Sequence, residues 1–424
     1  MQGLTKLRSG ALQFTIFIAA IIALLLLGVV LLISTHRFFL NQSALIVDNI
    51  QLAGAGIEYA KAMDSNTGDT LRVPYQGVSG QEIRVSLSRW GIFEKAFSKA
   101  AHKGKQFSKC ALLGTAIPKA QRPAVYLQET FKPLMVAGTT EIKGLSFLPQ
   151  QGIRPGNIAG NSYYGRELVY GQIRQSKPEL PILQPDLKNQ ISHYLRDYYP
   201  QASDEIILRK GDNLVHSFMG PTKGYYSGQA VILDDTRLYG NIIIRSHEKI
   251  VVKATADLKD VILVAPFIVV EDNVHGSFQA IADKGIKVGK DCRLMYPSAL
   301  ILAEEKADPI GAFNPDENKI TLGSGSTLFG SIAYLKSRLD LGYLNNIFIA
   351  PGATVKGEIY CQGNLELRGN VIGSVYTAQF LTSEQGTVFV NHLYNAVIRA
   401  EGLPYTFGGI LMENKPKSVM QWLY

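Results

Sequence analysis

The sequence predicts a mainly β protein that one long N-terminal α-helix holds at a membrane. Three observations support this fold class: an uncharged apolar run near the N-terminus, a composition with 18% charged residues and 40 glycines, and a repeat of short apolar segments in the C-terminal half. Few charges and many glycines are typical of β structure with tight turns. We expect the repeat to form a parallel β-helix and the region before it to be an irregular β-rich domain.

The apolar run extends from Gly10 to Thr35 and contains no charged side chain. A helix needs about 20 apolar residues to cross the hydrocarbon core of a bilayer, so this run is long enough. A cleaved signal peptide has a shorter apolar region of about 7–15 residues and a small-residue cleavage site, which does not follow here. We therefore predict a basic leader over 1–10 and a retained transmembrane helix over 11–35.

The charges that flank this run predict its orientation. Lys6 and Arg8 precede the run, whereas Arg37 alone directly follows it. Because positive residues are retained on the cytoplasmic side, we expect a cytoplasmic N-terminus. The protein would then be a single-pass protein of the bacterial inner membrane, with its bulk in the periplasm or at the cell exterior. The alternative is a scaffold that is tethered from inside, with the opposite topology.

The helix is predicted to continue beyond the membrane as a stalk over 36–66. No proline occurs from 37 to 63, and Leu45, Ile50 and Ile57 belong to a set of apolar residues at helical spacing. This set predicts that the outer half of the helix packs on the folded part. The sequence Asn66-Thr-Gly68 is a credible helix end.

The residues around Gly10 carry a family resemblance. A short basic leader that ends in Gly10, followed by Ala-Leu-Gln-Phe-Thr and a long apolar helix, resembles the N-terminus of type IV pilin-like proteins. The similar members are minor pilins and pseudopilins that lack a glutamate at the fifth mature position, which is Thr15 here. This resemblance implies cleavage between Gly10 and Ala11, and assembly with pilus or secretion-system subunits. An ordinary signal anchor is the alternative.

The region 67–227 is predicted to be a β-rich domain with a connecting segment rich in proline, glycine and tyrosine. Short alternating runs between 70 and 144 predict strands. The segment 93–110, in which lysines recur, fits either a helix or strands. Prolines exclude long regular elements over most of 149–225, but one helix fits at 185–198, with Leu187, Ile191 and Leu195 on one stripe.

A repeat defines the region 228–403. Ile250, Ile268 and Ile286 are separated by about 18 residues, as stacked coils require. In a parallel β-helix, each coil buries its inward side chains against the next coil, because one coil alone cannot bury them. A β-sandwich is disfavoured, since hairpin dipeptides such as Asn-Gly do not occur. The predicted core positions are Ile242, Ile250, Val261, Ile268, Phe278, Ile286, Ile347, Val355, Leu365 and Val371.

A second resemblance lies within this repeat. The segment 353–375, ATVKGEIYCQGNLELRGNVIGSV, looks like bactofilin sequences, which repeat a Val-x-Gly-x-Ile pattern. This resemblance implies a right-handed parallel β-helix that serves as a scaffold and polymerises end to end. We expect the C-terminal segment 404–424, which carries Met420, Trp422 and Tyr424, to cap the open end of the coil and cover its unpaired strand groups.

The sequence contains no recognised motif for catalysis, a cofactor or a metal. Its histidines never fall in paired metal-ligand spacing, and the acidic loop 304–318 lacks the spacing of a Ca²⁺ loop. The cysteines lie far apart, so we expect buried thiols, with one disulfide as the alternative. These cysteines are Cys110, Cys292 and Cys361. If the coil were a polysaccharide lyase or hydrolase, the candidate carboxylates would be Asp234, Asp235, Asp257, Asp260, Glu271 and Asp272.

We therefore expect a non-enzymatic, membrane-anchored structural or assembly protein of the cell envelope, pseudopilin-like at its N-terminus, whose β-helix is a scaffold or binding surface. The expected partners are membrane lipid and other envelope, pilus or secretion-system subunits, with self-association and polysaccharide as further candidates. Nucleic acid is not expected, since the lysines behind the net charge of +8 are scattered. The alternatives are an anchored carbohydrate-active enzyme and a bactofilin-like cytoskeletal scaffold.

Overall fold

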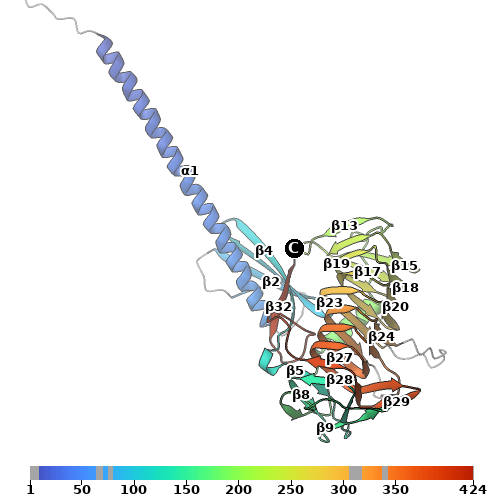
Figure 1. Ribbon diagram of the computed structural model, residues 1–424. Helices are drawn as coiled ribbons and strands as arrows, with labels where there is room; N and C mark the ends of the chain where they lie inside the picture. The colour runs from blue at the N-terminus through green and yellow to red at the C-terminus, as the bar shows by residue number, and fades with distance from the viewer. Residues whose placement is uncertain (1–8, 64–69, 75–79, 305–317, 337–341, 424) are drawn as a thin grey trace, which may run out of the picture.

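Residues 9–63, 70–74, 80–304, 318–336 and 342–423 are described by the computed structural model. They form one long helix, an antiparallel sheet and a large stack of parallel strands (Figure 1). The predictions of a mainly β protein and of a long N-terminal apolar helix are therefore confirmed. The predicted leader up to residue 8, the helix end at 66–68, Tyr424 and most of the acidic loop 304–318 lie outside the described residues.

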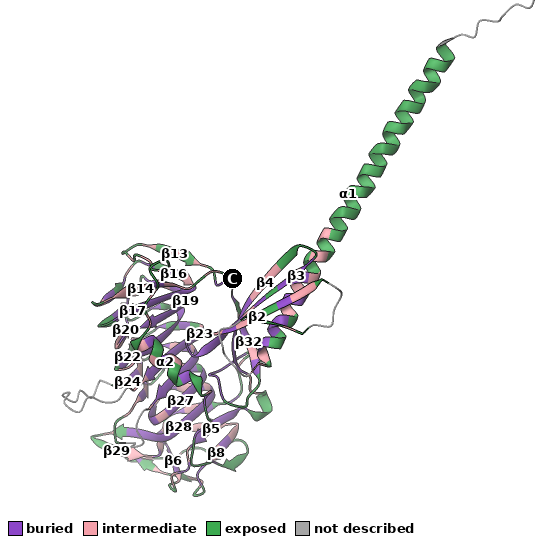
Figure 2. Cartoon of the chain, turned by 180° about the vertical axis from the view of Figure 1, so that it is seen from behind, coloured by how far each residue is buried: buried purple, intermediate pink, exposed green. Residues whose placement is uncertain are grey.

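Helix α1 (Ser9–Lys61) runs unbroken through the predicted membrane span and through the predicted stalk as far as Lys61. All its side chains from 10 to 40 are exposed, and the first buried one is that of Asn49. Figure 2 shows this change, since the helix is exposed along most of its length and becomes buried only where it meets the sheet. By length and composition, α1 is able to cross a membrane.

The antiparallel sheet has the strand order β1-β2-β3-β4-β32. Segment 93–110 forms strands rather than a helix, and two-residue turns join β2 to β3 and β3 to β4. Positive φ angles at Gly91 (61°) and at Lys103 and Gly104 (47° and 75°) give these turns the backbone that tight hairpins need. The strands are β1 (Thr70–Arg72), β2 (Gln81–Trp90), β3 (Phe93–His102), β4 (Lys105–Thr115) and β32 (Lys417–Leu423).

One face of this sheet packs against the last turns of α1. Gly56 permits the close approach, because a Cβ there would lie 2.1 Å from Ser98 Oγ and 2.8 Å from Ile83 Cγ2. The sheet therefore forms a core with the outer half of the helix, as the apolar spacing predicted. The buried members of this core are Leu52, Ala53, Ile57, Ala60, Ile83, Val85, Leu87, Ala96, Ala100, Ala111 and Leu113.

The parallel stack is made of short strands that each pair in parallel with strands of the next layer. All the core positions named from the sequence are buried in one apolar cluster inside the stack. One in-register column contains Ile250, Ile268, Ile286, Ile320, Ile347 and Leu365. The strands are β13 (Asn213–His216), β14 (Lys223–Ser227), β15 (Val231–Leu233), β16 (Arg237–Gly240), β17 (Ile242–Ser246), β18 (Lys249–Val252), β19 (Asp257–Val264), β20 (Phe267–Val270), β21 (His275–Ala282), β22 (Gly285–Val288), β23 (Arg293–Ala303), β24 (Lys319–Leu322), β25 (Thr327–Leu335), β26 (Ile347–Ile349), β27 (Thr354–Leu367) and β28 (Asn370–Glu384).

Residues 123–175 extend this stack beyond β28, so the prediction that they belong to a separate middle domain was wrong. Val125 pairs in parallel with Val375 of β28, and two further strands follow in the same direction. The physical reason is that β28 leaves an edge of backbone groups, which the earlier segment covers. The added strands are β5 (Pro123–Leu127), β7 (Glu141–Lys143), β8 (Leu145–Leu148), β12 (Ile173–Gln175) and, from the C-terminal side, β31 (Val397–Arg399).

The chain then passes along the stack through α2 (Asp186–Arg196) and starts β13 at the opposite end. This helix lies within the predicted span 185–198. Smaller elements complete the fold. They are the short 3-10 helix Lys119–Gln121, the three-stranded sheet of β6 (Leu134–Ala137), β9 (Ile153–Pro155) and β30 (His392–Tyr394), the pair β10 (Asn157–Ile158) and β11 (Asn161–Ser162), and β29 (Thr387–Val390), which pairs with the end of β28.

The C-terminal segment does not cap the stack, which corrects the prediction for 404–424. Instead β32 pairs antiparallel with β4 and completes the sheet that carries α1. The outer edge of β4 needs a partner, whereas the end of the stack after β28 is already covered by residues 123–175. Residues 404–416, here called the C-terminal strap, lead from the stack to this strand.

Candidate functional site

A third cluster of buried residues lies at the joint between the sheet and the parallel stack. On the side of the stack made by β17, β19, β21, β23, β25, β27 and β28, one apolar cluster unites four parts of the chain. The sheet contributes Trp90, Phe93 and Leu112, α2 contributes Leu187 and Ile191, the C-terminal strap contributes Ile410 and Met412, and the stack contributes Ile262, Ile281, Ile301 and Tyr360. Leu195 packs against this cluster, so the predicted stripe of α2 faces the stack.

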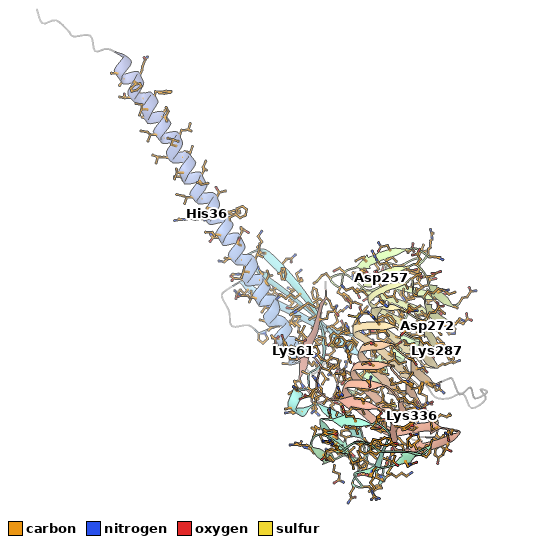
Figure 3. All side chains as sticks on the ribbon, in the orientation of Figure 1. His36, Lys61, Asp257, Asp272, Lys287 and Lys336 are labelled. Carbon is orange, nitrogen blue, oxygen red and sulfur yellow. The ribbon has the colours of Figure 1, made fainter. Side chains whose placement is uncertain are left out.

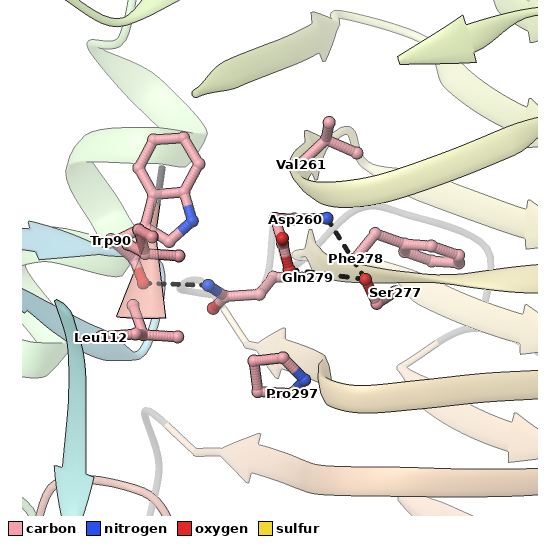
Figure 4. Close-up of a pocket in the computed structure, with 9 residues that line it drawn as sticks. Trp90, Leu112, Asp260, Val261, Ser277, Phe278, Gln279 and Pro297 are labelled. Carbon is pink, nitrogen blue, oxygen red and sulfur yellow. Dashed lines mark hydrogen bonds between the residues drawn. The ribbon is translucent and has the colours of Figure 1, made fainter. Parts of the chain in front are cut away.

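Gln279 of β21 holds the tip of the β2–β3 hairpin (Figure 4). Its Oε1 accepts a hydrogen bond from the Ile92 N–H at 3.0 Å, and its Nε2 donates to the Trp90 carbonyl at 2.9 Å. From α2, the Tyr194 hydroxyl accepts a hydrogen bond from the Gly91 N–H at 3.3 Å. The hairpin tip is therefore fixed by both the stack and α2.

Sequence reasoning did not identify Gln279, because a lone glutamine in a strand points to no particular partner. The available signal was Gly91 in Trp90-Gly-Ile-Phe93, since glycine at the first turn position is typical of a tight two-residue hairpin. That signal predicts the turn but not what lies against it.

Asp260 makes a second polar contact across the joint. Its Oδ2 accepts a hydrogen bond from Gln421 Nε2 of β32 at 2.9 Å. Burial raises the pKa of the Asp260 carboxyl. Asp260, Trp90 and Gln279 border a cavity of about 10 Å³. Such a volume is near the lower limit for a single water molecule, so this cavity is packing space rather than a ligand site.

A buried ionic cluster lies beneath the end of α1. Glu94 is 1% exposed, with its Oε1 3.4 Å from Arg89 Nη1 and its Oε2 2.7 Å from Lys417 Nζ. Lys417 Nζ also donates to the Met63 carbonyl at 2.7 Å. Lys417 belongs to β32, so this cluster ties the C-terminal strand to the residues that follow the helix.

Glu358 of β27 anchors the C-terminal strap. Its side chain is 3% exposed, and its Oε1 accepts a hydrogen bond from the Ile410 N–H. Burial raises the pKa of Glu358 from its ordinary value of 4.5 to about 7, although the Ile410 hydrogen bond and the charge of Arg122 oppose this effect. Glu358 is therefore a titratable group at the point where the strap meets the stack.

The carboxylates considered for a sugar-cleaving site do not converge. Asp234 pairs with Lys210 at 2.7 Å, and Asp257 pairs with Arg237 at 3.1 Å. Glu271 lies 3.8 Å from Lys253, and Asp272 Oδ1 accepts from the Lys290 N–H at 2.6 Å. The backbone N–H of Asp235 donates a hydrogen bond to Thr255 Oγ1 at 3.0 Å. Figure 3 shows Asp257 and Asp272 as separate positions on the stack, whereas Asp260 lies in the joint.

The cysteines are buried and free, in agreement with the expected thiols. Burial raises the pKa of Cys110 to about 11, so this thiol stays protonated at neutral pH. Burial likewise raises the pKa of Cys361 to about 12. Among the described residues, no group of three or more His, Cys, Asp or Glu side chains is placed to hold a metal ion.

The predicted processing junction lies at the start of α1. Gly10 and Ala11 are both exposed, and a Cβ on Gly10 would meet no neighbouring atom within 4 Å. Nothing among the described residues therefore covers this peptide bond.

No protein family and no curated protein sequence matches this chain. A solved structure, that of the competence-associated pilin ComZ from Thermus thermophilus, is similar with 10% sequence identity and a TM-score of 0.26. The alignment covers 89% of this chain and 97% of that chain. At this TM-score the likeness supports no inference about the function of this chain.

Proposed function

We propose that this protein is a single-pass, membrane-anchored structural or assembly protein of the bacterial cell envelope, pseudopilin-like in its N-terminal part. The observation that carries this proposal is the division of α1 into two parts. The side chains of residues 10–40, here called the bare part of α1, are exposed and mostly apolar. The last turns of the helix pack on an antiparallel sheet. Such an extent of exposed apolar surface requires lipid or a protein partner.

The proposed location is the inner membrane, with a cytoplasmic N-terminus and the bulk in the periplasm or at the cell exterior. Lys6 and Arg8 before the apolar run and Arg37 after it support this orientation. The proposed partners are membrane lipid and other pilus or secretion-system subunits, which would contact the bare part of α1.

We further propose that the parallel stack is a right-handed parallel β-helix that acts as a scaffold or binding surface. One observation and one general rule support this architecture. Successive layers pair in parallel and in register, as at Val355 and Val371. Parallel crossover connections are also right-handed in nearly all proteins. A scaffold needs a rigid body, and the stacked apolar column provides one.

A non-enzymatic role is part of this proposal. The carboxylates that would serve a glycosidase pair with separate basic groups or backbone N–H groups, and Asp260 is occupied by Gln421. A glycosidase needs two carboxyl groups that flank one bond, about 5–9.5 Å apart. Turnover of a polysaccharide that is abolished by replacing Asp257 would contradict this role.

The mature N-terminus tests the pseudopilin-like assignment directly. We expect mass spectrometry of the protein purified from membranes to find a chain that begins at Ala11. A chain that begins at Met1 would leave an ordinary signal anchor and would overturn the assignment.

Orientation is tested by labelling one engineered cysteine, Lys287→Cys, on the exposed surface of the stack. The native thiols are buried and give little background. We expect a membrane-impermeant maleimide to label intact spheroplasts, with lysed cells as the control. Labelling only after lysis would favour the cytoplasmic, bactofilin-like alternative.

A further inference from the structure

An open groove of about 390 Å³ lies on a side of the parallel stack that the sheet, α2 and the C-terminal strap do not cover. Successive layers contribute to it, with Lys319 from β24, Phe348 from β26 and Glu366 from β27. In Figure 1, β24 lies on the side of the stack remote from α1. The volume is within the range of about 300–1,000 Å³ that is usual for small-molecule sites.

The floor of the groove is apolar. Phe348 points outward, because its neighbours Ile347 and Ile349 are fully buried in the stack. Its ring is half-buried, and Lys319 Nζ lies 5.9 Å from the ring centroid. Pro351 is exposed beside it. A flat ring and a proline give a surface on which the apolar face of another ring can lie.

The rim of the groove is polar and held in place. The Glu366 carboxylate is the centre of this network. Its Oε1 accepts from Arg368 Nε at 2.8 Å, and its Oε2 accepts from Asn345 Nδ2 at 2.6 Å. Arg368 also pairs with Glu384 at 2.7 Å. The polar groups of these side chains are already held in place by one another. Binding of a ligand to them therefore costs little further side-chain entropy of the protein.

Among the residues that the structure describes, the charges around the groove balance. Lys319 and Arg368 are cationic, whereas Glu366 and the Glu384 that binds Arg368 are anionic. A balanced rim gives no net attraction for a polyanion, which is held mainly by excess positive charge. An apolar floor with a neutral, hydrogen-bonding rim instead matches a ring with an apolar face and hydroxyl groups at its edge.

We propose that this groove binds a neutral glycan, with one sugar ring over Phe348 and its hydroxyl groups facing Asn345, Arg368 and the exposed Ser383. The inference deepens the binding-surface role proposed above and rests on it, since it names the ligand class that the surface takes. The glycan occupies the side of the stack remote from the helix, so binding leaves the bare part of α1 accessible.

The test is a titration of the full chain in a detergent without a sugar headgroup, since maltoside headgroups would compete. The probes are two neutral oligosaccharides, chitotetraose and maltotetraose, followed by calorimetry and saturation-transfer NMR. We expect at least one probe to bind, and Phe348→Ala to weaken its binding by about tenfold or more. Ser383→Trp, which fills the groove, should have the same effect.

Phe267→Ala is the matched control. Phe267 is also half-buried on the stack and lies under a lysine, with Lys284 Nζ 5.9 Å from its ring centroid. It lies outside the groove, so this variant should bind the probe like the unmodified protein. Thermal melting of each variant checks that the fold is intact.

Failure of both probes to bind the unmodified protein would overturn the proposal. The proposal would also be overturned if the Phe348→Ala and Ser383→Trp variants bound the probe as tightly as the unmodified protein does. Preferential, salt-sensitive binding of polygalacturonate or single-stranded DNA that Phe348→Ala leaves intact would replace it with a polyanion surface. A chain that starts at Ala11 but binds no probe refutes the glycan alone, whereas a chain that binds but starts at Met1 refutes only the pseudopilin-like assignment.

Discussion

The side-chain amide of Gln279 lies so close to Gly91 that a Cβ on Gly91 would be 1.9 Å from its Oε1. The same amide hydrogen-bonds the residues on both sides of Gly91. The contact leaves no room for a side chain at the tip of the hairpin. It joins the sheet that carries α1 to the parallel stack.

We predict that Gly91→Ala loosens this joint and costs about 2 kcal/mol or more of unfolding free energy. Both the positive φ of 61° and the clash with Gln279 oppose the methyl group. The measurement is urea unfolding, together with hydrogen exchange at residues 90–92. Gly104→Ala is the matched control, because Gly104 has a φ of 75° but a Cβ there would meet no atom within 4 Å. Equal losses in both variants would show that Gln279 exerts no steric constraint.

We predict that Ile286→Asp destabilises the whole parallel stack, and Ile268→Asp likewise. Ile286 is 1% exposed and pairs in register with Ile268 and Ile320, so the carboxylate would enter a continuous apolar column. The expected loss is about 4 kcal/mol or more. Lys287→Asp, at the exposed neighbouring position, should change the melting temperature little. Unchanged melting of Ile286→Asp would contradict the register.

We predict that Gly56→Ala moves α1 away from the sheet and lowers stability by about 1–3 kcal/mol. The new methyl group would clash with Ser98 Oγ and Ile83 Cγ2. Gly54→Ala is the control, since the close neighbour of a Cβ there is the flexible end of Lys109 at 3.3 Å. Thermal melting in detergent compares the two variants. A Gly54 variant that is the less stable of the pair would refute this packing.

We predict that Glu358 makes the protein less stable as pH rises from about 4.5 to about 7. The folded-state pKa is about 7, above the ordinary 4.5, so the folded protein keeps a proton that the unfolded chain releases in this window. The stabilisation by Glu358 is fully present below about pH 4.5 and is lost as the pH rises through about 7. Its upper limit is about 3 kcal/mol.

The measurement for Glu358 is the urea midpoint at pH 5 and at pH 7.5. Glu358→Gln keeps an oxygen acceptor for the Ile410 N–H but cannot titrate, so its midpoint should vary less between these pH values. Glu413→Gln changes an exposed carboxylate of the same strap and serves as the control. An identical pH response of the unmodified protein and Glu358→Gln would contradict the prediction.

The column of the parallel stack could be predicted because its contacts join residues about one coil apart. Each inward position must be apolar whatever its exact neighbours are, so Ile250, Ile268 and Ile286 mark the layers in the sequence. The structure pairs these residues in register. The outer half of α1 could be predicted on similar grounds, since helical spacing alone selects the face that contains Ile57.

The partners of the strand edges could not be predicted in this way. The run Pro123–Leu127 is buried throughout, and this pattern is the same whether it pairs within a middle domain or on β28. The strand that contains Trp422 is equally compatible with a cap and with an edge of the sheet. Alternation of side chains specifies a strand and its faces, but it does not specify which edge accepts it.

The contacts between the sheet and the parallel stack could not be predicted from the sequence for a related reason. Gln279, Asp260 and Gln421 are polar residues whose partners lie far away in the sequence. A buried polar group needs a partner, but its chemistry does not identify which distant group provides it.

The position of β32 has a consequence for how the protein is made. The sheet that grips α1 contains β2, β3 and β4 from the early part of the chain, but its last strand is synthesised only after the entire parallel stack. Until then, β4 presents an open edge of the kind that attracts other chains. A polypeptide interrupted anywhere in the stack would keep that edge open. Closure of the sheet therefore requires that the parallel stack has already been synthesised.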